Sequence, residues 1–494
     1  MYEKLLKIVT ELGSPNVLIV GDFMLDIYTY GDALRISPEA PVPVLKIKNT
    51  ETRAGGAGAV AADLAILGAK VYCVGLTGND ENGRILKNIL TGLDIDVSGL
   101  LTLEDRPTIS KQRLIGLAQH RHQQQLFRMD NENTTPISDE QADGVFNLFE
   151  EKLSQADIVC LQDYNKGLLT DGFCKRLIQQ SRQIGKIVLI DPSPTADYAK
   201  YSGATAITPN RQETSIAVGF EINTKSDYAL ASEKLFKELN LQAVIITLDK
   251  EGAYLKTSSQ SEIIPTRPRN VYDVTGAGDM VLASLAVSLA AGCDYKTAVL
   301  LANIAGGIEV EKFGVATVTV EEIINEIISQ NLSKAGKVRT LDSLLPELKW
   351  HRSQGRKIVF TNGCFDVLHR GHIEYLKFCK NQGDIVVVGL NSDVSVKVIK
   401  GPNRPINNQY DRATVLAALE SVDYIVIFNE PDPLNLIKQI KPDMLIKGQD
   451  WEGKVVIGAE EVKKNGGELI FAPLVKGTSS TATIEKIKSL SDAD

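Results

Sequence analysis

The stretch Asp273-Val-Thr-Gly-Ala-Gly-Asp279 leads directly into the apolar run 280–291, which ends at Gly292. Glycines before a helix let the backbone approach a ligand closely, and the first helical turn offers unpaired N–H groups that favour negative charge. The stretch therefore predicts an anion-binding turn, with Asp279 placed to accept a proton from an attacking hydroxyl. A glycine turn that only caps a buried helix is the alternative that this stretch alone leaves open.

Short apolar runs typical of buried strands recur upstream of this turn, at 17–20, 158–161, 187–190 and 243–247. Helix-like segments separate them, which predicts an α/β fold with a doubly wound parallel sheet. Residues 29–48 and 106–130 break this rhythm, because polar and apolar strand-forming residues alternate there. We expect these two segments to form a small β lid on the α/β core.

A second α/β series follows, with strand-like runs at 357–360, 385–388, 424–427 and 444–446. The segment 331–340 between the two series is polar and has no periodicity, so we expect a domain boundary there. The predicted organisation is a first domain over residues 1–330, a linker over 331–344 and a Rossmann-like domain over 345–494.

The overall composition excludes several classes of protein. The 494 residues carry 54 Lys and Arg against 62 Asp and Glu, a net charge of −8, so no basic field would recruit nucleic acid or an anionic membrane. The six cysteines form no C-x-x-C pair, which is typical of a reducing compartment. The N-terminus resembles no signal peptide and the longest apolar run is too short to span a bilayer. We therefore expect a cytoplasmic protein with no nucleic-acid or membrane partner.

Two polar turns in the first domain suit nucleotide binding. No G-x-x-x-x-G-K-[ST] loop occurs in the sequence, which excludes a P-loop kinase. The segment Asn210-Arg-Gln-Glu213 follows a strand and offers an amide and a carboxylate that could organise a magnesium–phosphate group. A second strand ends in the turn 247–252, which could hold a nucleotide.

With these motifs in place, residues 1–330 resemble the ribokinase-like sugar kinase family, whose late signature is D-T-x-G-A-G-D. The runs Gly21–Asp26 and Arg35–Val44 are similar to the subgroup that phosphorylates heptose 7-phosphate. The resemblance implies Asp279 as general base and the backbone of Gly276, Ala277 and Gly278 as anion hole. It further implies nucleotide binding by Asn210, Arg211, Gln212, Glu213, Asp249, Gly252 and Asn303, with magnesium at Glu213, and substrate binding by Asp26, Arg35, Gly55, Gly56 and Lys166.

Two residues depart from the pattern of this subgroup. Ala59 stands where the family usually has an asparagine that contacts sugar, and Ser193 stands where heptose kinases usually have lysine. Loss of one buried hydrogen bond typically costs ~1 kcal/mol, which weakens binding without abolishing chemistry. The departures therefore bear on the identity of the sugar more than on kinase activity.

The second domain contains His369 and His372 directly after the turn Thr361-Asn-Gly-Cys-Phe-Asp366. Two histidines three residues apart could ligate a metal, but no further ligands follow at a recognised spacing. A strand, a glycine turn and a helix start are again suited to phosphate, and imidazoles there can donate hydrogen bonds to phosphate oxygens as charge develops. Gly371 would let a nucleotide pack against the backbone.

Three further segments fit nucleotidyl transfer: the basic turn 400–405, the hydroxyl-rich turn 477–484 and Lys447 at the end of a strand. With H-x-G-H, they make this half resemble the cytidylyltransferase-like nucleotidyltransferase family, and its heptose 1-phosphate adenylyltransferase members in particular. The resemblance implies His369 and His372 as catalytic residues, phosphate contacts by Lys400, Arg404, Ser479, Ser480 and Thr481, and nucleotide contacts by Phe365, Gly371 and Lys447.

Both resemblances occur in this order in the bifunctional kinase/adenylyltransferase family of ADP-heptose synthesis, which feeds the lipopolysaccharide core. Membership would imply phosphosugar and ATP as substrates of both halves, Mg²⁺ as cofactor and a homodimer formed through the kinase lid. One alternative is another sugar kinase fused to a transferase that uses CTP or ATP on a different substrate. A second is a sugar-binding regulatory domain without catalysis.

Overall fold

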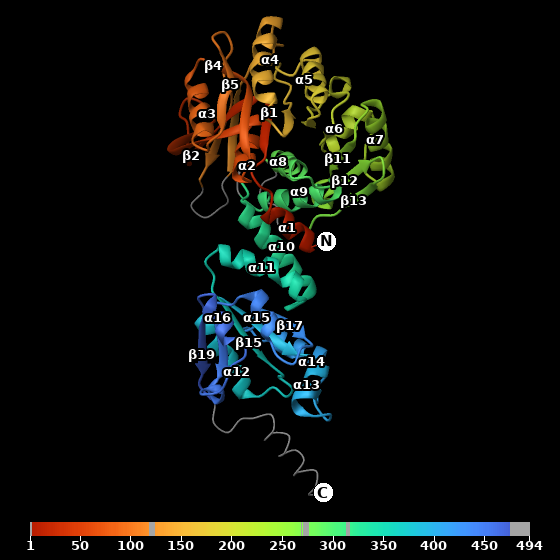
Figure 1. The fold of residues 1–494 in the computed structure, drawn as a ribbon. Coiled ribbons are helices and arrows are strands. Elements are labelled where there is room, and N and C mark those ends of the chain that lie inside the picture. Colours follow the sequence, from red (N-terminus) through yellow and green to blue (C-terminus); the bar gives the residue numbers. More distant parts are fainter. Residues whose placement is uncertain (1, 118–123, 268, 270–275, 313–316, 475–494) are drawn as a thin grey trace. The chain divides into compact units, whose positions relative to one another are not determined.

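The computed structural model describes residues 2–117, 124–267, 269, 276–312 and 317–474 (Figure 1). The chain divides into two compact units, one of Glu11–Asn325 and one of Glu326–Asp494 with Met1–Thr10. Each unit contains its own β-sheet and its own hydrophobic core. The two units are described separately below.

The larger unit contains a nine-stranded sheet in the order β13-β12-β11-β10-β9-β8-β1-β4-β5. The strands from β5 to β11 are parallel, and β12 and β13 are antiparallel additions at one edge. The prediction of a mainly parallel α/β sheet is therefore confirmed. Its strands are β1 (Asn16–Gly21), β4 (Lys70–Gly78), β5 (Asp96–Leu103), β8 (Ile158–Gln162), β9 (Ile187–Asp191), β10 (Ala206–Ile207), β11 (Ala243–Thr247), β12 (Ala253–Thr257) and β13 (Ser261–Ile264).

Helices cover both faces of this sheet (Figure 1). One face packs against apolar residues of α4 (Asp139–Leu153), α5 (Asp171–Gln183), α6 (Arg211–Val218) and α7 (Lys225–Glu238). On the other side lie α2 (Ala57–Ile66) and α8 (Ala277–Ala290), and α9 (Tyr295–Glu309) packs on α8. Burial on both faces explains why the central strands read as continuous apolar runs. The remaining helices of this unit are α3 (Glu81–Thr91), the 3-10 turns η1 (Ala199–Tyr201) and η2 (Asp249–Glu251), and the start of α10 (Val320–Ala335).

The predicted lid is present as a separate four-stranded sheet in the order β3-β2-β6-β7. It consists of β2 (Phe23–Ile36), β3 (Pro43–Gly56), β6 (Ile109–Gly116) and β7 (Gln124–Asn131). The lid begins earlier than expected, at Phe23. The start of β2 is apolar and buried, so it lacks the alternation of polar and apolar residues by which the lid was predicted, whereas the end of β2 is exposed. Strand pairing in the lid thus includes residues before the expected start at residue 29.

The smaller unit contains a six-stranded parallel sheet in the order β14-β17-β16-β15-β18-β19. Its strands are β14 (Val338–Arg339), β15 (Ile358–Gly363), β16 (Ile385–Asn391), β17 (Tyr424–Phe428), β18 (Met444–Gly448) and β19 (Glu468–Ala472). Two buried apolar clusters, one on each face, hold the helices. These are α11 (Leu341–Ser353), α12 (Arg370–Gln382), α13 (Asp393–Lys400), α14 (Gln409–Ala417), α15 (Leu434–Ile440) and α16 (Ala459–Lys464), with the 3-10 turn η3 (Gln449–Trp451); α1 (Tyr2–Thr10) packs on α11.

The segment 331–344, which we predicted as a linker, contains regular structure. The end of α10, strand β14 and the start of α11 occupy it. Its polar residues are compatible with folding because Arg339 of β14 is buried in an ion pair with Glu347 of α11, at 2.9 Å. The position of the domain boundary stays a prediction.

No helix in the described part of the chain combines the length and the apolar character needed to cross a lipid bilayer.

Candidate active sites

Asp279 lies in the first turn of α8, where its carboxylate is almost completely buried. Its Oδ1 accepts a hydrogen bond from Gln162 Nε2 at 3.1 Å and one from the Tyr164 hydroxyl at 3.2 Å. Gly276, before the helix, has a φ of 98°, a left-handed conformation that favours glycine. The predicted turn 276–278 therefore does lie at a helix N-terminus beside a carboxylate, whereas Asp273, Val274 and Thr275 lie outside the described residues.

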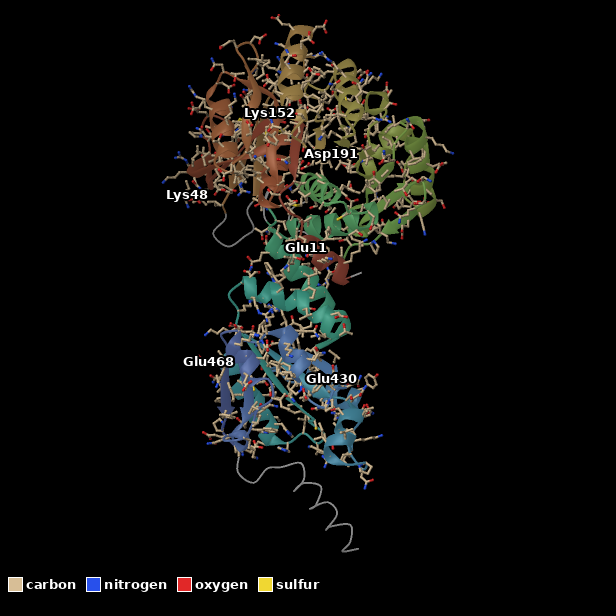
Figure 2. All side chains as sticks on the ribbon, viewed as in Figure 1. Glu11, Lys48, Lys152, Asp191, Glu430 and Glu468 are labelled. Carbon is tan, nitrogen blue, oxygen red and sulfur yellow. The ribbon has the colours of Figure 1, made fainter. Side chains whose placement is uncertain are left out.

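Gln162 connects this carboxylate to a second one. Its Nε2 also donates to Asp191 Oδ2 at 2.8 Å, and Thr208 Oγ1 donates to the other oxygen of Asp191 at 3.0 Å. Figure 2 labels Asp191 among the side chains of the larger unit. Gln162 and Asp191 end the neighbouring parallel strands β8 and β9, and ligands bind at such carboxyl ends. The position at a strand end was the signal that our sequence reading overlooked for both residues.

The buried location changes the acidity of these groups. Burial raises the pKa of Asp279 to about 8, and the negative charge of Asp191 contributes to this rise. Burial likewise raises the pKa of Asp191 to about 6, although the hydrogen bonds from Gln162 and Thr208 act to lower it. A carboxyl group with a pKa near neutrality is a suitable general base for a hydroxyl.

The predicted nucleotide residues lie at the start of α6 and in the turn after β11. Asn210 and Glu213 form a capping box in which each side chain accepts from the other's backbone N–H, at 2.9 and 2.8 Å. Arg211 connects α6 to η2 through an ion pair with Glu251 at 2.8 Å. An isolated bridge between Asn210 and Thr247 brings the two turns together.

The remaining residues of this group have mixed positions. A Cβ on Gly252 would lie 2.2 Å from the Ile264 carbonyl oxygen, and Asn303 Nδ2 donates to the same oxygen at 2.8 Å. These two residues are therefore neighbours, and their contact with a nucleotide stays a prediction. Asp249 is largely exposed on η2, with its side chain 3.6 Å from Arg211, and Gln212 is exposed on α6.

Three of the predicted sugar residues, Asp26, Gly55 and Gly56, lie together on the lid strands β2 and β3. Asp26 of β2 is buried and pairs with Arg113 of β6 at 2.5 Å. A Cβ on Gly55 would lie only 2.3 Å from Asp26 Oδ2, so a larger residue there would displace the Asp26 carboxylate, and Gly56 has a φ of 56°. Arg35, in contrast, is exposed at the far end of β2. Nine residues of extended strand place it roughly 30 Å from Asp26, so the fold of this chain does not bring it to the site.

The residues for which the sequence departs from the heptose kinase pattern are both buried. Ala59 lies within α2, and the Ser193 hydroxyl is 3.2 Å from the Tyr201 hydroxyl. Tyr201 also donates to Asp163 Oδ2, which is paired with Lys200 at 2.6 Å. Ser193 is therefore part of a hydrogen-bonded network within the fold. Lys166, predicted to meet phosphate, forms an ion pair with Glu132 at 2.7 Å.

In the smaller unit, His369 precedes α12 and His372 lies in its first turn. Their rings are stacked, with centroids 3.9 Å apart, and the Phe365 ring lies 5.2 Å from that of His372. The Nδ1 atoms of both histidines are buried, with no hydrogen-bond partner among the described residues. Burial lowers both pKa values, that of His372 to about 4, with further lowering from His369 and Lys400. Both imidazoles are therefore neutral at pH 7, and each carries one N–H donor.

A cavity of about 700 Å³ opens beside the two histidines. Its volume is in the range of small-molecule sites. It brings together six of the predicted residues with several that our sequence reading did not single out, notably Trp451. The predicted residues that line it are Phe365, His369, Gly371, His372, Lys400 and Lys447.

Lys447 ends β18 at the carboxyl edge of the sheet and lines this cavity. Its Nζ donates to Asn362 Oδ1 at 2.6 Å and lies 5.5 Å from the centre of the Trp451 ring. Burial lowers the pKa of Lys447 to about 8, although the negative charge of Asp450 acts to raise it. The ammonium form therefore predominates at pH 7 and can meet a phosphate.

Arg404 binds a carboxylate of the chain itself. Its Nε is bound to the buried carboxylate of Asp366, which also accepts from the backbone N–H of Ile406 at 2.7 Å. Arg404 does not line the cavity. The bond to Asp366 holds Arg404 in the turn that follows Lys400, and the predicted phosphate contact of Arg404 stays a prediction. Ser479, Ser480 and Thr481 lie outside the described residues.

No group of three or more His, Cys, Asp or Glu side chains with the spacing of a metal site occurs in the part of the chain that the structure describes.

Comparison with known proteins decides the family. Residues 14–322 match the pfkB family carbohydrate kinase model, and residues 360–485 match the cytidylyltransferase-like model. A curated bifunctional protein HldE of Wolinella succinogenes is 44% identical over 475 residues, which cover 96% of this chain and 98% of the relative. The chain belongs to the bifunctional HldE family. The HldE of Sulfurimonas denitrificans is similar at 42% identity, over 96% of this chain and 98% of the relative.

Solved structures confirm the fold of the larger unit. Arabidopsis thaliana ribokinase, solved with ribose and ATP, matches with a TM-score of 0.51 at 20% identity, over 64% of this chain and 99% of that one. Phosphofructokinase-2 of Escherichia coli with fructose-6-phosphate matches with a TM-score of 0.52 at 17% identity, over 64% and 99%. The two family models and the HldE relatives confirm the ribokinase-like and nucleotidyltransferase assignments made from the sequence, and the chain is an enzyme with a kinase and a nucleotidyltransferase half.

The electrostatic effect of Asp191 on Asp279 predicts a shift in the pH dependence of sugar phosphorylation. For the wild type, kcat/KM should rise with pH as Asp279 loses its proton, near pH 8 in the free enzyme. Asp191→Asn removes a negative charge that raises this pKa, so the rising limb should move to lower pH. Asp143→Asn, on the surface of α4, is the control and should leave the profile unchanged. An unmoved limb in Asp191→Asn would show that the two carboxyl groups are not coupled.

Proposed function

We propose that the chain catalyses two reactions of ADP-heptose synthesis. The larger unit phosphorylates O1 of D-glycero-β-D-manno-heptose 7-phosphate with ATP. After a separate phosphatase removes the 7-phosphate, the smaller unit transfers AMP from ATP to heptose 1-phosphate and releases pyrophosphate. The product would serve the lipopolysaccharide inner core, and both reactions would take place in the cytoplasm.

The observation that carries this proposal is the presence of two different phosphate-directed sites in one chain. In the first, a buried carboxylate lies in the first turn of α8 beside the glycine turn 276–278. The acceptor hydroxyl would give its proton to Asp279 while the backbone N–H groups of the turn stabilise charge on the transferred phosphoryl group. Asp26 and Gly55, at the base of the lid, would hold sugar hydroxyls.

In the second site no proton needs to be removed, because the attacking group is already a phosphate. The neutral imidazoles of His369 and His372 would donate to the nucleotide's phosphates, and Lys400 and Lys447 would supply positive charge from the cavity wall. Gly371 leaves room for the nucleotide beside α12.

Magnesium is part of the proposal for both reactions. Burial raises the pKa of the Glu213 carboxyl to about 7, and Asp191 adds to this rise. A divalent cation bound to the ATP phosphates fits such crowded negative charge, and hard carboxylate and phosphate oxygens are the ligands that Mg²⁺ prefers. Glu213 would hold the ion, directly or through water, and the ion would neutralise phosphate charge.

The two sites should be separable by single substitutions. Asp279→Asn removes the base and should lower sugar phosphorylation by about 100-fold or more, with nucleotidyl transfer unchanged. His372→Ala should lower nucleotidyl transfer by a similar factor, with sugar phosphorylation unchanged. Each variant is the control for the other, and both rates are measured on the same preparation. Loss of both reactions in either variant would contradict a two-site protein.

Ala59 and Ser193 depart from the heptose kinase pattern and therefore favour one alternative, a different sugar as the substrate. A different phosphosugar, or CTP in the second reaction, would leave the same catalytic residues in place. A panel of phosphosugars with ATP and CTP distinguishes these cases: heptose 7-phosphate should give the highest kcat/KM in the first reaction and ATP in the second. Turnover of another sugar but not of heptose 7-phosphate would refute the substrate assignment. A regulatory protein without catalysis would consume no ATP.

A homodimer through the lid belongs to the proposal as well. Exposed apolar side chains lie on the lid strands and in the turn between β2 and β3: Leu34, Ile36, Val42, Ile47, Phe127 and Met129. On β7, Phe127 and Met129 alternate with Arg128 and Asp130, so they lie on the face opposite to these charges. An apolar sheet face of this kind is suited to a second copy.

The oligomeric state tests this part of the proposal. Phe127→Asp, which replaces a side chain that is 61% exposed, should convert a dimer to a monomer without unfolding the protein. Sedimentation or light scattering measures the change, and Leu230→Asp on the outer surface of α7 is a control of similar exposure, at 62%. A wild-type protein that is already monomeric at high concentration would refute the dimer.

A further inference from the structure

Lys111 occupies a central position on the lid. In the register of the lid sheet it lies beside Asp26 of β2 and Asp130 of β7. Its Nζ is 4.9 Å from the centre of the Tyr164 ring, and the hydroxyl of that ring donates to Asp279 Oδ1 at 3.2 Å. A single aromatic ring thus separates the Lys111 ammonium from the carboxylate that takes the proton.

Within the described residues, no carboxylate forms an ion pair with Lys111. Three cations act on it electrostatically, and each of them has an acidic partner of its own. The pairs are Arg113 with Asp26, Arg128 with Asp130 and Lys166 with Glu132, at 2.5, 2.6 and 2.7 Å. Lys111 has no carboxylate within ion-pairing distance among the described residues, although Asp26 and Asp130 are its neighbours in the sheet.

An unmatched ammonium is unfavourable where it is partly buried. Burial lowers the pKa of Lys111, and the positive charges of Arg128, Lys166 and Arg113 lower it further. The negative charge of Asp26 acts in the opposite direction and raises this pKa. The contact with the face of the Tyr164 ring offsets only a small part of this penalty. The position is therefore prepared for an anion that the protein itself does not provide.

We propose that Lys111 binds the phosphate group that the sugar substrate already carries, with Arg128 and Lys166 adding positive charge beside it. This inference rests on the proposed sugar kinase function. The phosphates of the nucleotide are directed to the glycine turn at α8, whereas Lys111 belongs to the lid together with Asp26. A sugar whose hydroxyl contacts Asp279 would extend its distant phosphate across the Tyr164 ring to Lys111.

This contact would determine which end of the sugar meets the base. A sugar without a phosphate has several hydroxyls of similar reactivity, and it could bind in more than one orientation. Fixing the distant phosphate leaves one hydroxyl within reach of Asp279, and correct positioning is a large part of rate acceleration. Lys111 would therefore select phosphosugars over free sugars as substrates of the first reaction.

The test compares Lys111→Met with the wild type on heptose 7-phosphate and on the same heptose without its phosphate. Lys111→Met should lower kcat/KM for the phosphosugar by about 30-fold or more, mainly through KM, and leave the free sugar nearly unaffected. Lys111→Arg should restore part of the loss, because it keeps the charge. Lys48→Met is the matched control. It removes another lid ammonium, which is paired with Asp32 and more than half exposed, and it should leave kcat/KM unchanged for both sugars.

A binding measurement separates this inference from the proposed function. With ADP and Mg²⁺ saturating the nucleotide site, inorganic phosphate should bind the wild type in calorimetry and bind Lys111→Met at least tenfold more weakly. If the wild type phosphorylated neither sugar, the proposed function would be wrong. The calorimetry would still show whether Lys111 binds phosphate. Equal losses of kcat on both sugars, or unchanged phosphate binding, would overturn the assignment of Lys111.

Discussion

The carboxylate of Asp279 is removed from water, and the residues around it determine whether it can hold a charge. Burial alone would keep the proton on, and the nearby charge of Asp191 acts in the same direction. Opposing them, the hydroxyl of Tyr164 and the amide of Gln162 donate to Oδ1. Because Gln162 also donates to Asp191, one amide fixes the geometry of both carboxyl groups. The sheet contributes Gln162 and Asp191 to this cluster, the glycine turn lies directly before Asp279, and Lys111 of the lid contacts the Tyr164 ring.

The smaller unit meets the same requirement, stabilisation of phosphate charge, with different chemistry. Its catalytic groups are two neutral, stacked imidazoles at the start of α12. The difference follows from the acceptor: a sugar hydroxyl needs a base, whereas a sugar phosphate is already a nucleophile. In both units the groups lie beside a helix N-terminus and the carboxyl ends of parallel strands, where backbone geometry favours anions.

The sequence predicted the parts of this arrangement that depend on local pattern. Continuous apolar runs identified the central strands, and the glycine turn before α8 and the histidines of α12 lie where their motifs indicated. Side-chain partnerships between distant segments could not be predicted in this way. The interactions of Arg404 with Asp366 and of Gln162 with both carboxylates join residues 38, 29 and 117 positions apart. A motif also does not show how far a strand carries its end away, and β2 carries Arg35 away from Asp26.

The most direct measurement is the titration of Asp279 itself, by NMR of protein with ¹³C-labelled aspartate carboxyl groups, with Asp279→Asn used for assignment. We predict one aspartate signal that titrates near pH 8 in the wild type and is missing from the variant. If every signal that disappears in Asp279→Asn titrates at the ordinary pKa of an aspartate, about 4, then Asp279 is not the buried, coupled carboxylate on which the kinase site is built.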